Sequence, residues 1–350
     1  MNKIEDFGLA WLSLTYNCNN NCIWCYAESN NLVNRHKSLD IKRLNPIILL
    51  LKDLGIKKVA LIGGEPTLYD KIFDVIHKLS ENGFSTHIVT NGRRFSNLNF
   101  AKKMKEKGLT HAGFSIEGSS SLLHNKITNV ENSFIETVKG LENAIKVGIK
   151  TYSNTTICQS NINDLVNIVD FVSQYEIRSI NFNICGPCLS VEHNYAMKPS
   201  QASNAYINVY NKLKLLGIKG KLLTATPLCN FEQPLRNELK QNRVIHGGPC
   251  QLAHGKNFVI DYNGDIIPCT HLTGFPMFNI FYENDRVISK DEFIDFYNDP
   301  KYIPFQFRKG MSRYASEKCE RINCAENCAG GCPLFWTKFN PDKEITGIKN

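Results

Sequence analysis

"LAWLSLTYNCNNNCIWC", residues 9–25, passes from a predicted β-strand directly into a loop that carries Cys18, Cys22 and Cys25. An aromatic residue stands on each side of the third cysteine. Structural zinc sites take four ligands in a closed tetrahedron. Three thiolates around a cubane iron–sulfur cluster instead leave one iron open to an exogenous ligand. The loop therefore predicts a reactive iron–sulfur site, although short cysteine triplets also occur in zinc modules.

The alternation of strand and helix that begins here continues to about residue 185. Short runs rich in β-branched and aromatic residues alternate with helical patterns, several of which end in glycine. Six such units indicate parallel strands joined by right-handed crossovers, and hence an α/β protein with a partial (β/α)6 TIM barrel. The predicted strands are 9–15, 57–63, 85–90, 111–116, 150–157 and 178–184.

The most unusual residues of this region follow the predicted strands. In TIM barrels the reactive groups lie on the loops at the carboxyl ends of the strands. We therefore expect one rim of the barrel to carry the chemistry. The loops are "YNCNNNCIWC" (16–25), "GGEPTL" (63–68), "NGRR" (91–94), "EGSSS" (117–121), "CQSN" (158–161) and "CGPC" (185–188).

Three of these elements together resemble the radical S-adenosylmethionine (SAM) enzymes. "CNNNCIWC" (18–25) resembles the C-x3-C-x2-C loop of that family, "GGEP" (63–66) its glycine-rich element, and "FSIEG" (114–118) its acidic element after the fourth strand. The resemblance implies a [4Fe–4S] cluster held by the three cysteines, with SAM on the open iron. It also implies that one electron cleaves SAM to methionine and a 5′-deoxyadenosyl radical, which takes a hydrogen atom from the substrate.

The resemblance further implies which residues surround SAM. Glycines permit a close backbone approach, and exposed carbonyls accept hydrogen bonds from the amine of SAM. The family's H-D-x-x-R stretch reads "HNKIT" (124–128) here, so Thr128 stands in place of the arginine and Lys126 is the expected substitute. Taken alone, "GGEP" is compatible with a plain turn, and Glu117 with a charge at a helix N-terminus. The residues assigned to SAM are Trp24, Tyr26, Gly63, Gly64, Glu65, Pro66, Asn91, Ser115, Glu117, Lys126 and Asn154.

The C-terminal cysteines resemble the SPASM/twitch extension that many radical SAM enzymes carry. The pattern begins as C-x13-G-x4-C, but the next segment is C-x4-C-x3-C where the family has C-x2-C-x5-C, and no cysteine follows Cys332. The resemblance implies one or two auxiliary [4Fe–4S] clusters with a ligand missing. A four-cysteine zinc ribbon with two spare thiols is the alternative. The resemblance gives Cys250, Cys269 and Cys332 to one cluster and Cys319, Cys324 and Cys328 to the other.

These patterns divide the chain into four predicted parts. The largest is the radical SAM partial TIM barrel, and the second is a helical or irregular linker whose clearest helix is 200–217. A small cysteine-rich α+β domain of the SPASM/twitch type and a C-terminal tail follow. The parts are residues 1–190, 191–244, 245–338 and 339–350.

Composition excludes several classes of protein. Thirteen cysteines without a secretion signal indicate metal ligation in a reducing, cytoplasmic compartment rather than disulfides. No apolar run approaches the ~20 residues that a membrane span needs. The formal charge is +8, but the lysines of residues 101–108 are spread around a predicted helix without interleaved aromatics. We therefore expect no nucleic acid and no membrane among the partners.

Extensions of this type occur in enzymes that modify peptides, which gives the first functional hypothesis. It is a radical SAM maturase that introduces a crosslink, a thioether or an epimerised residue into a ribosomally made peptide, with an electron donor such as flavodoxin or ferredoxin. Sulfatase maturation is disfavoured because Thr270 stands where those maturases have an aspartate base. The alternatives are a small-molecule dehydrogenase or epimerase acting on an aminocyclitol or sugar, and a non-enzymatic iron–sulfur or zinc regulator or scaffold.

Three further residues are candidates for catalysis. Cys185 and Cys188 form a C-x-x-C that becomes a thioredoxin-like redox pair if a helix begins at the first cysteine. The alternatives for these two thiols are a hydrogen-atom donor, a ligand of an auxiliary cluster, and an unreactive buried group. His271 is a candidate base or ligand, with a plain hydrogen-bonded histidine as the alternative. Cys158 and Cys229 are interpreted as structural.

Overall fold

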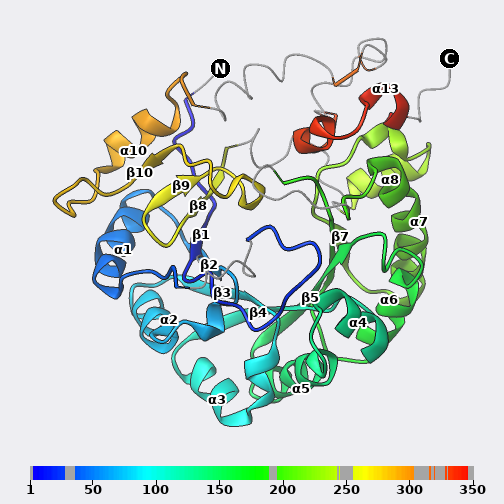
Figure 1. Ribbon diagram of the computed structural model, residues 1–350, viewed down its shortest axis with the longest axis horizontal. Coiled ribbons are helices and arrows are strands. Elements are labelled where there is room, and N and C mark those ends of the chain that lie inside the picture. The colour runs from blue at the N-terminus through cyan, green and yellow to red at the C-terminus, as the bar shows by residue number, and fades with distance from the viewer. Residues whose placement is uncertain are drawn as a thin grey trace.

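β1 (Leu9–Ser13) lies near the middle of a curved sheet ringed by helices (Figure 1). The computed structural model describes residues 3–27, 36–188, 195–242, 244, 255–302, 315–316, 319, 328 and 330–345. Within these residues, ten strands form one sheet in the order β10-β9-β8-β1-β2-β3-β4-β5-β6-β7. All strand pairs from β8 through β1 to β7 are parallel, so these strands have their carboxyl ends at one edge.

The sequence explains why the helices cover the outside of this sheet. In the second main helix the buried residues Ile72, Val75, Ile76 and Leu79 recur every three to four positions, which places them on one helix face. The other strands are β2 (Lys58–Ile62), β3 (Ser85–Thr90), β4 (Leu109–Ser115), β5 (Lys150–Ile157), β6 (Ile180–Ile184), β7 (Gly220–Leu222), β8 (Asn257–Ile260), β9 (Asp265–Ile267) and β10 (Phe278–Asn279). The helices are α1 (Leu44–Asp53), α2 (Ile72–Glu81), α3 (Leu98–Glu106), α4 (Ser121–Thr128), α5 (Ser133–Lys146), α6 (Leu165–Val172), α7 (Pro199–Leu216), α8 (Leu235–Gln241), α10 (Lys290–Tyr297) and α13 (Pro341–Glu344).

The partial parallel barrel is confirmed, and so are its six predicted strands, with ends that differ by two residues or fewer. The expectation that the β/α alternation stops at residue 190 is wrong. α7, predicted as a helix at 200–217, is followed by β7, which pairs in parallel with β6. β7 escaped the sequence pattern because it has three residues, too few for a periodicity.

The cysteine-rich region extends the opposite edge of the same sheet. β8 pairs in parallel with β1, β9 pairs antiparallel with β8, and β10 antiparallel with β9. The sheet is therefore continuous across the boundaries placed at residues 190 and 245, and the division into domains stays a prediction.

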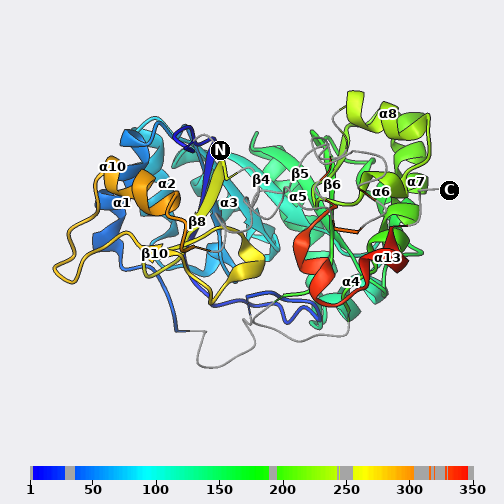
Figure 2. The ribbon, with the colours of Figure 1, turned by 90° about the horizontal axis from the view of Figure 1, so that it is seen from above.

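The segment from Cys332 to Trp336 links the two edges of the sheet. The Cys332 N–H donates to Ala225 O at 2.8 Å, beyond β7, while Leu334 packs in one cluster with Ile62 and Val259 of β2 and β8. Figure 2 shows this red segment between the yellow strands and the green helices. None of the helices in the described part of the chain has the length and apolar character that a bilayer span requires.

Candidate functional site

The three-cysteine loop follows β1 and is fastened at the carboxyl edge of the sheet. Asn21 and Ile23 donate their backbone N–H groups to Thr128 O and Ile127 O, at 2.9 and 3.0 Å. On the other side, the Arg93 guanidinium donates to the backbone oxygen of Asn19 and to Glu136. The loop is therefore held by the end of α4 and by the loop after β3.

Gly63 and Gly64 hold the start of this loop by direct backbone contact. A Cβ on Gly63, whose φ is +150°, would lie 2.2 Å from Thr15 O, and a Cβ on Gly64 would lie 2.5 Å from Tyr16 O. The Gly64 N–H donates to Thr15 O at 2.7 Å. The close approach expected for SAM is thus already made by the backbone that leads into the cysteines.

The side chain of Glu65 is engaged within the protein, and its assignment to SAM stays a prediction. It is 1% exposed, and its carboxylate accepts hydrogen bonds from Thr67 N, Thr67 Oγ1, Thr90 Oγ1 and Asn91 N at 2.5–3.0 Å. Three of these donors meet Oε1, and the Asn91 N–H meets Oε2. Burial raises the pKa of Glu65, and these hydrogen bonds act against that rise. The residue ties the "GGEP" loop, with Pro66 beginning a 3-10 turn, to the loop after β3.

We expect Glu65→Gln to lower the free energy of unfolding by about 2–4 kcal/mol. In this variant the side-chain NH2 group would face N–H and O–H donors that now donate to a carboxylate oxygen of Glu65. Chemical denaturation measures this difference. Glu131→Gln, at an exposed position, is the matched control and should shift the value by less than about 0.5 kcal/mol. Equal stabilities of the two variants would contradict the structural role.

Several other residues assigned to SAM lie at the same edge. Ser115 and Asn154 are partners in the register of β4 and β5, and both are partly exposed. Asn91, directly after β3, donates from Nδ2 to Asn19 Oδ1 in the cysteine loop at 2.6 Å. Glu117 is 2% exposed and accepts from Thr156 N at 2.8 Å, and burial raises its pKa to about 8.

Lys126, the expected substitute for the family's arginine, lies on the exposed face of α4. Lys126 is exposed, whereas His124, Ile127 and Thr128 are buried on the other face of the helix. The Thr128 hydroxyl is engaged with His124 O and Ser133 Oγ, at 3.0 and 2.7 Å. Thr128 therefore stabilises the junction of α4 and α5.

His124 gives the site a pH dependence. It is fully buried, its Nδ1 accepts the Glu117 N–H at 3.2 Å, and burial lowers its pKa to about 4. The unfolded chain takes up this proton near pH 6.5. Between these values the unfolded state binds more protons, so the free energy of unfolding should fall by roughly 2–4 kcal/mol as the pH drops from 6.5 to 4. His124→Asn keeps a hydrogen-bond acceptor but does not titrate, so denaturation curves of this variant should lack the fall in the free energy of unfolding that His124 causes. An unchanged dependence of that free energy on pH would contradict the assignment of the pKa to His124.

The chemistry of the donor set at the loop fits an iron–sulfur cluster. Burial raises the pKa of Cys18 to about 12, and burial and the neighbouring Cys25 raise that of Cys22, so thiolates here need a cation beside them. Within the described ranges, no three His, Cys, Asp or Glu side chains converge tightly enough for a single metal ion. The buried Trp24 Nε1 has no hydrogen-bond partner among the residues that the structure describes and is a donor available to cluster sulfur.

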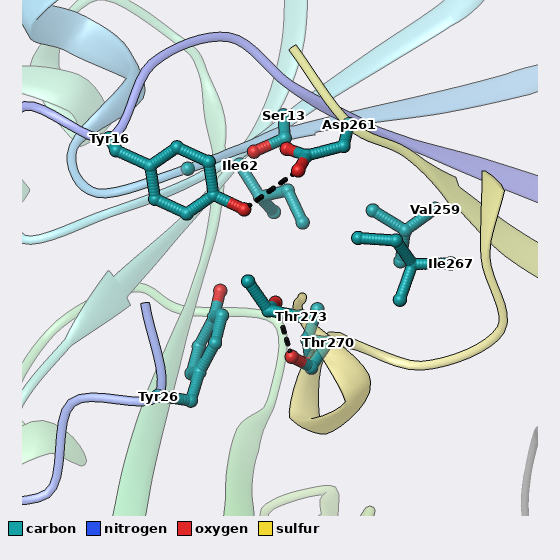
Figure 3. Close-up of a pocket in the computed structure, with 10 residues that line it drawn as sticks. Ser13, Tyr16, Tyr26, Ile62, Val259, Asp261, Ile267, Thr270 and Thr273 are labelled. Carbon is teal, nitrogen blue, oxygen red and sulfur yellow. Dashed lines mark hydrogen bonds between the residues drawn. The ribbon is translucent and has the colours of Figure 1, made fainter. Parts of the chain in front are cut away.

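A small pocket lies between the cysteine loop and the C-terminal strands (Figure 3). Tyr16 donates its hydroxyl to Asp261 Oδ2 at 2.9 Å, and the Tyr26 side chain points toward the same space. His271 meets the Tyr26 ring edge-on at 6.0 Å, and burial lowers the pKa of His271. The sequence analysis did not identify Tyr16 or Asp261, which are 245 positions apart; no local pattern connects them.

The C-x-x-C at the end of β6 does not have thioredoxin-like geometry. Residues 185–188 are not helical, so the helix that a thioredoxin-like pair requires at the first cysteine is absent from this described segment. Cys185 is 4% exposed, and burial raises its pKa. Cys188 is more accessible, and burial, followed by the proximity of Cys269 and Cys25, raises its pKa to about 12. Cys188 is therefore near one predicted ligand of the N-terminal cluster, Cys25, and one of an auxiliary cluster, Cys269.

The C-terminal cysteines fall into two neighbourhoods. Cys269 and Cys332 pack against one apolar cluster that includes Val259 and Leu334. Cys319 and Cys328 are buried elsewhere, beside the 3-10 turn η4 (Leu228–Asn230). Cys332 also packs against the main core cluster that contains Cys328, so the assignment of these cysteines to two clusters stays a prediction. The remaining predicted ligands, Cys250 and Cys324, lie outside the described residues.

Comparisons with known proteins agree with this geometry. Residues 12–172 match the family described as the Radical SAM superfamily. The chain is 31% identical over 171 residues to Probable GTP 3',8-cyclase of Sulfurisphaera tokodaii, covering 48% of this chain and 52% of the relative. It is 26% identical over 240 residues to Fe-coproporphyrin III synthase of Methanosarcina barkeri, covering 66% and 58%. The chain thus spans about half the length of these curated relatives.

Two solved structures share the fold over almost the whole chain. Streptococcus suis SuiB bound to its precursor peptide SuiA has a TM-score of 0.73 at 18% identity, covering 97% of this chain and 75% of SuiB. Native anSMEcpe with bound AdoMet has a TM-score of 0.71 at 16% identity, covering 97% and 96%. The likeness includes both the barrel and the C-terminal region.

Proposed function

Because residues 12–172 belong to the radical SAM superfamily, we propose that this chain cleaves SAM reductively and takes a hydrogen atom from a residue of a ribosomally made peptide. The observation that carries the proposal is the loop of Cys18, Cys22 and Cys25, three thiols fastened at the carboxyl edge of a parallel barrel. Three thiolates hold a [4Fe–4S] cluster and leave one iron for SAM.

The residues of the chain hold, orient and shield the reacting groups. When bound, the cluster and SAM together supply an organic radical able to abstract an unactivated hydrogen. Asn91, Ser115 and Asn154 offer polar atoms beside the cysteine loop for SAM. Glu117, with a pKa near 8, is neutral at pH 7 and is proposed as a hydrogen-bond donor at this end of the barrel.

The fold supports a peptide substrate. SuiB, whose structure was solved with the peptide SuiA, and anSMEcpe, solved with the Kp18Cys peptide, share the architecture of this chain. We further propose that the C-terminal region holds one or two auxiliary clusters, that flavodoxin or ferredoxin supplies the electron, and that the protein works in the reducing cytoplasm.

A small-molecule substrate is the second candidate, and the sequence relatives favour it. The relatives named above include GTP 3',8-cyclases at up to 31% identity, although that match covers about half of each chain. This candidate includes the nucleotide chemistry of those relatives and the aminocyclitol or sugar chemistry inferred from the sequence.

Deuterium transfer tests the two candidates against each other. The anaerobically reconstituted, dithionite-reduced protein is incubated with SAM and either a deuterated peptide encoded beside its gene or deuterated GTP and aminocyclitols. We expect deuterium in 5′-deoxyadenosine from the peptide and a mass change in that peptide. Transfer from a small molecule and from no peptide would overturn the peptide assignment.

Cys188 and His271 are proposed to act on the product side of the reaction. Cys188 is the accessible thiol near Cys25, whereas Cys185 is buried, so Cys188 is the proposed hydrogen-atom donor. We expect Cys188→Ala to lose at least about 100-fold in modified product while 5′-deoxyadenosine still forms. The variant lacks only the thiol that is proposed to donate a hydrogen atom after SAM has been cleaved. Mass spectrometry of peptide and nucleoside measures both. Cys158→Ala, at a fully buried position, is the control; equal product yields in the two variants would contradict the role.

A further inference from the structure

Cys229 was interpreted as structural, but it lies among the C-terminal cluster cysteines. It belongs to η4 and is 5% exposed. With Cys319 and Ile345 it forms one small buried cluster. The preceding residue, Leu228, donates its backbone N–H to Cys328 Sγ at 3.4 Å. Cys229, Cys319 and Cys328, which are far apart in the sequence, are therefore neighbours in the fold.

The backbones around these cysteines approach one another closely. The Cys332 N–H donates to Ala225 O at 2.8 Å. A Cβ on Gly331, whose φ is +85°, would lie 2.7 Å from Pro227 Cδ and 3.0 Å from Pro227 N. Gly331 is thus required where the C-terminal segment meets the chain just before η4. The contact fixes Cys229 relative to the C-terminal cysteines.

Two buried polar side chains at this place have no hydrogen-bond partner within the described part of the chain. Asn230, next to Cys229, is 7% exposed, and both its Nδ2 and its Oδ1 are unpartnered. Trp336 packs against the cluster of Cys229, Cys319 and Ile345, and its buried Nε1 is unpartnered as well. An unsatisfied buried donor costs about 1–3 kcal/mol, so these N–H groups indicate an acceptor that belongs at the site.

We propose that Cys229 is a ligand of the auxiliary iron–sulfur cluster held by Cys319 and Cys328. Asn230 and Trp336 donate N–H groups to the sulfurs of this cluster. Backbone and side-chain N–H groups compensate the charge of a buried cluster and adjust its reduction potential. The inference rests on the proposed auxiliary clusters.

Iron counting in the full-length chain tests the assignment. The triple variant Cys18→Ala, Cys22→Ala and Cys25→Ala removes the N-terminal cluster, so that only auxiliary iron and sulfide remain. In this background we expect Cys229→Ser to lose about four irons per chain, or to convert one cluster to a three-iron form detectable by electron paramagnetic resonance. Cys158→Ser, which changes a thiol buried to the same degree, should retain all iron.

A second comparison separates ligand loss from misfolding. Cys319→Ser should remove the same cluster, so the double variant Cys229→Ser, Cys319→Ser should lose no more iron than Cys319→Ser alone. Cys269→Ser should add a separate loss if a second cluster is present. Full iron retention in Cys229→Ser, or an equal loss in Cys158→Ser, would overturn the role of Cys229. A triple-variant background without any iron would instead refute the auxiliary clusters themselves.

Discussion

Replacing Cys22 by alanine should abolish the reductive cleavage of SAM. Cys22 is one of only three thiols in the loop, and the backbone on both sides of it is fixed by Asn21 and Ile23 to the end of α4. Removing even an outer partner of a metal ligand costs about 10- to 100-fold in metal affinity or activity, so loss of a ligand itself should exceed about 100-fold. Chromatography of 5′-deoxyadenosine formed under dithionite measures the effect.

The control for this experiment is Cys158→Ala, which removes a buried thiol from outside the loop. That variant should retain SAM cleavage within a few-fold of the unmodified protein, because its loss affects packing alone. The same nucleoside yield from Cys22→Ala as from the control would show that the loop does not hold the reactive cluster.

Gly64→Ala should have nearly as large an effect without touching a ligand. Its Cβ would lie 2.5 and 2.6 Å from the backbone oxygens of Tyr16 and Asn17, which cannot move without displacing the cysteine loop. We expect the free energy of unfolding to fall by about 3 kcal/mol or more. We also expect SAM cleavage to fall about 100-fold, the usual result of a displacement of about 1 Å near a reacting centre.

Gly55→Ala distinguishes this steric effect from backbone strain. Gly55 has φ +74° but no atom within 4 Å of the position of a Cβ, so the substitution should cost about 1–2 kcal/mol and leave iron content unchanged. Iron and acid-labile sulfide, measured after reconstitution, should decrease in Gly64→Ala alone. Normal iron content and activity in Gly64→Ala would contradict the contact between the two loops.

The sequence was sufficient where the signal is local. The strands from β1 to β6 have runs of β-branched and aromatic residues, and the cysteine loop follows the first of them, so both the barrel and the position of its reactive edge could be predicted. β7 could not, because three residues carry no periodicity and its place beside β6 depends on tertiary pairing.

The roles of individual side chains depended on long-range contacts. Motif resemblance assigns Glu65 to SAM, but it does not indicate the hydrogen bonds that the carboxylate accepts from Thr67, Thr90 and Asn91. The backbone at Cys185 could not be predicted, because a C-x-x-C spacing does not determine the conformation that follows a strand. The contact between the Cys229 segment and Cys328 spans 100 positions, and nothing in the spacing of the cysteines indicates it.

The central claim is that Cys18, Cys22 and Cys25 hold a cluster with one iron that lacks a protein ligand. Anomalous diffraction at the iron and zinc edges, from crystals grown without oxygen, tests it most directly. The account predicts four iron positions at the loop, three of them bonded to these cysteines and the fourth bonded to no protein atom. Zinc at this position, or a fourth protein ligand on the cluster, would contradict it.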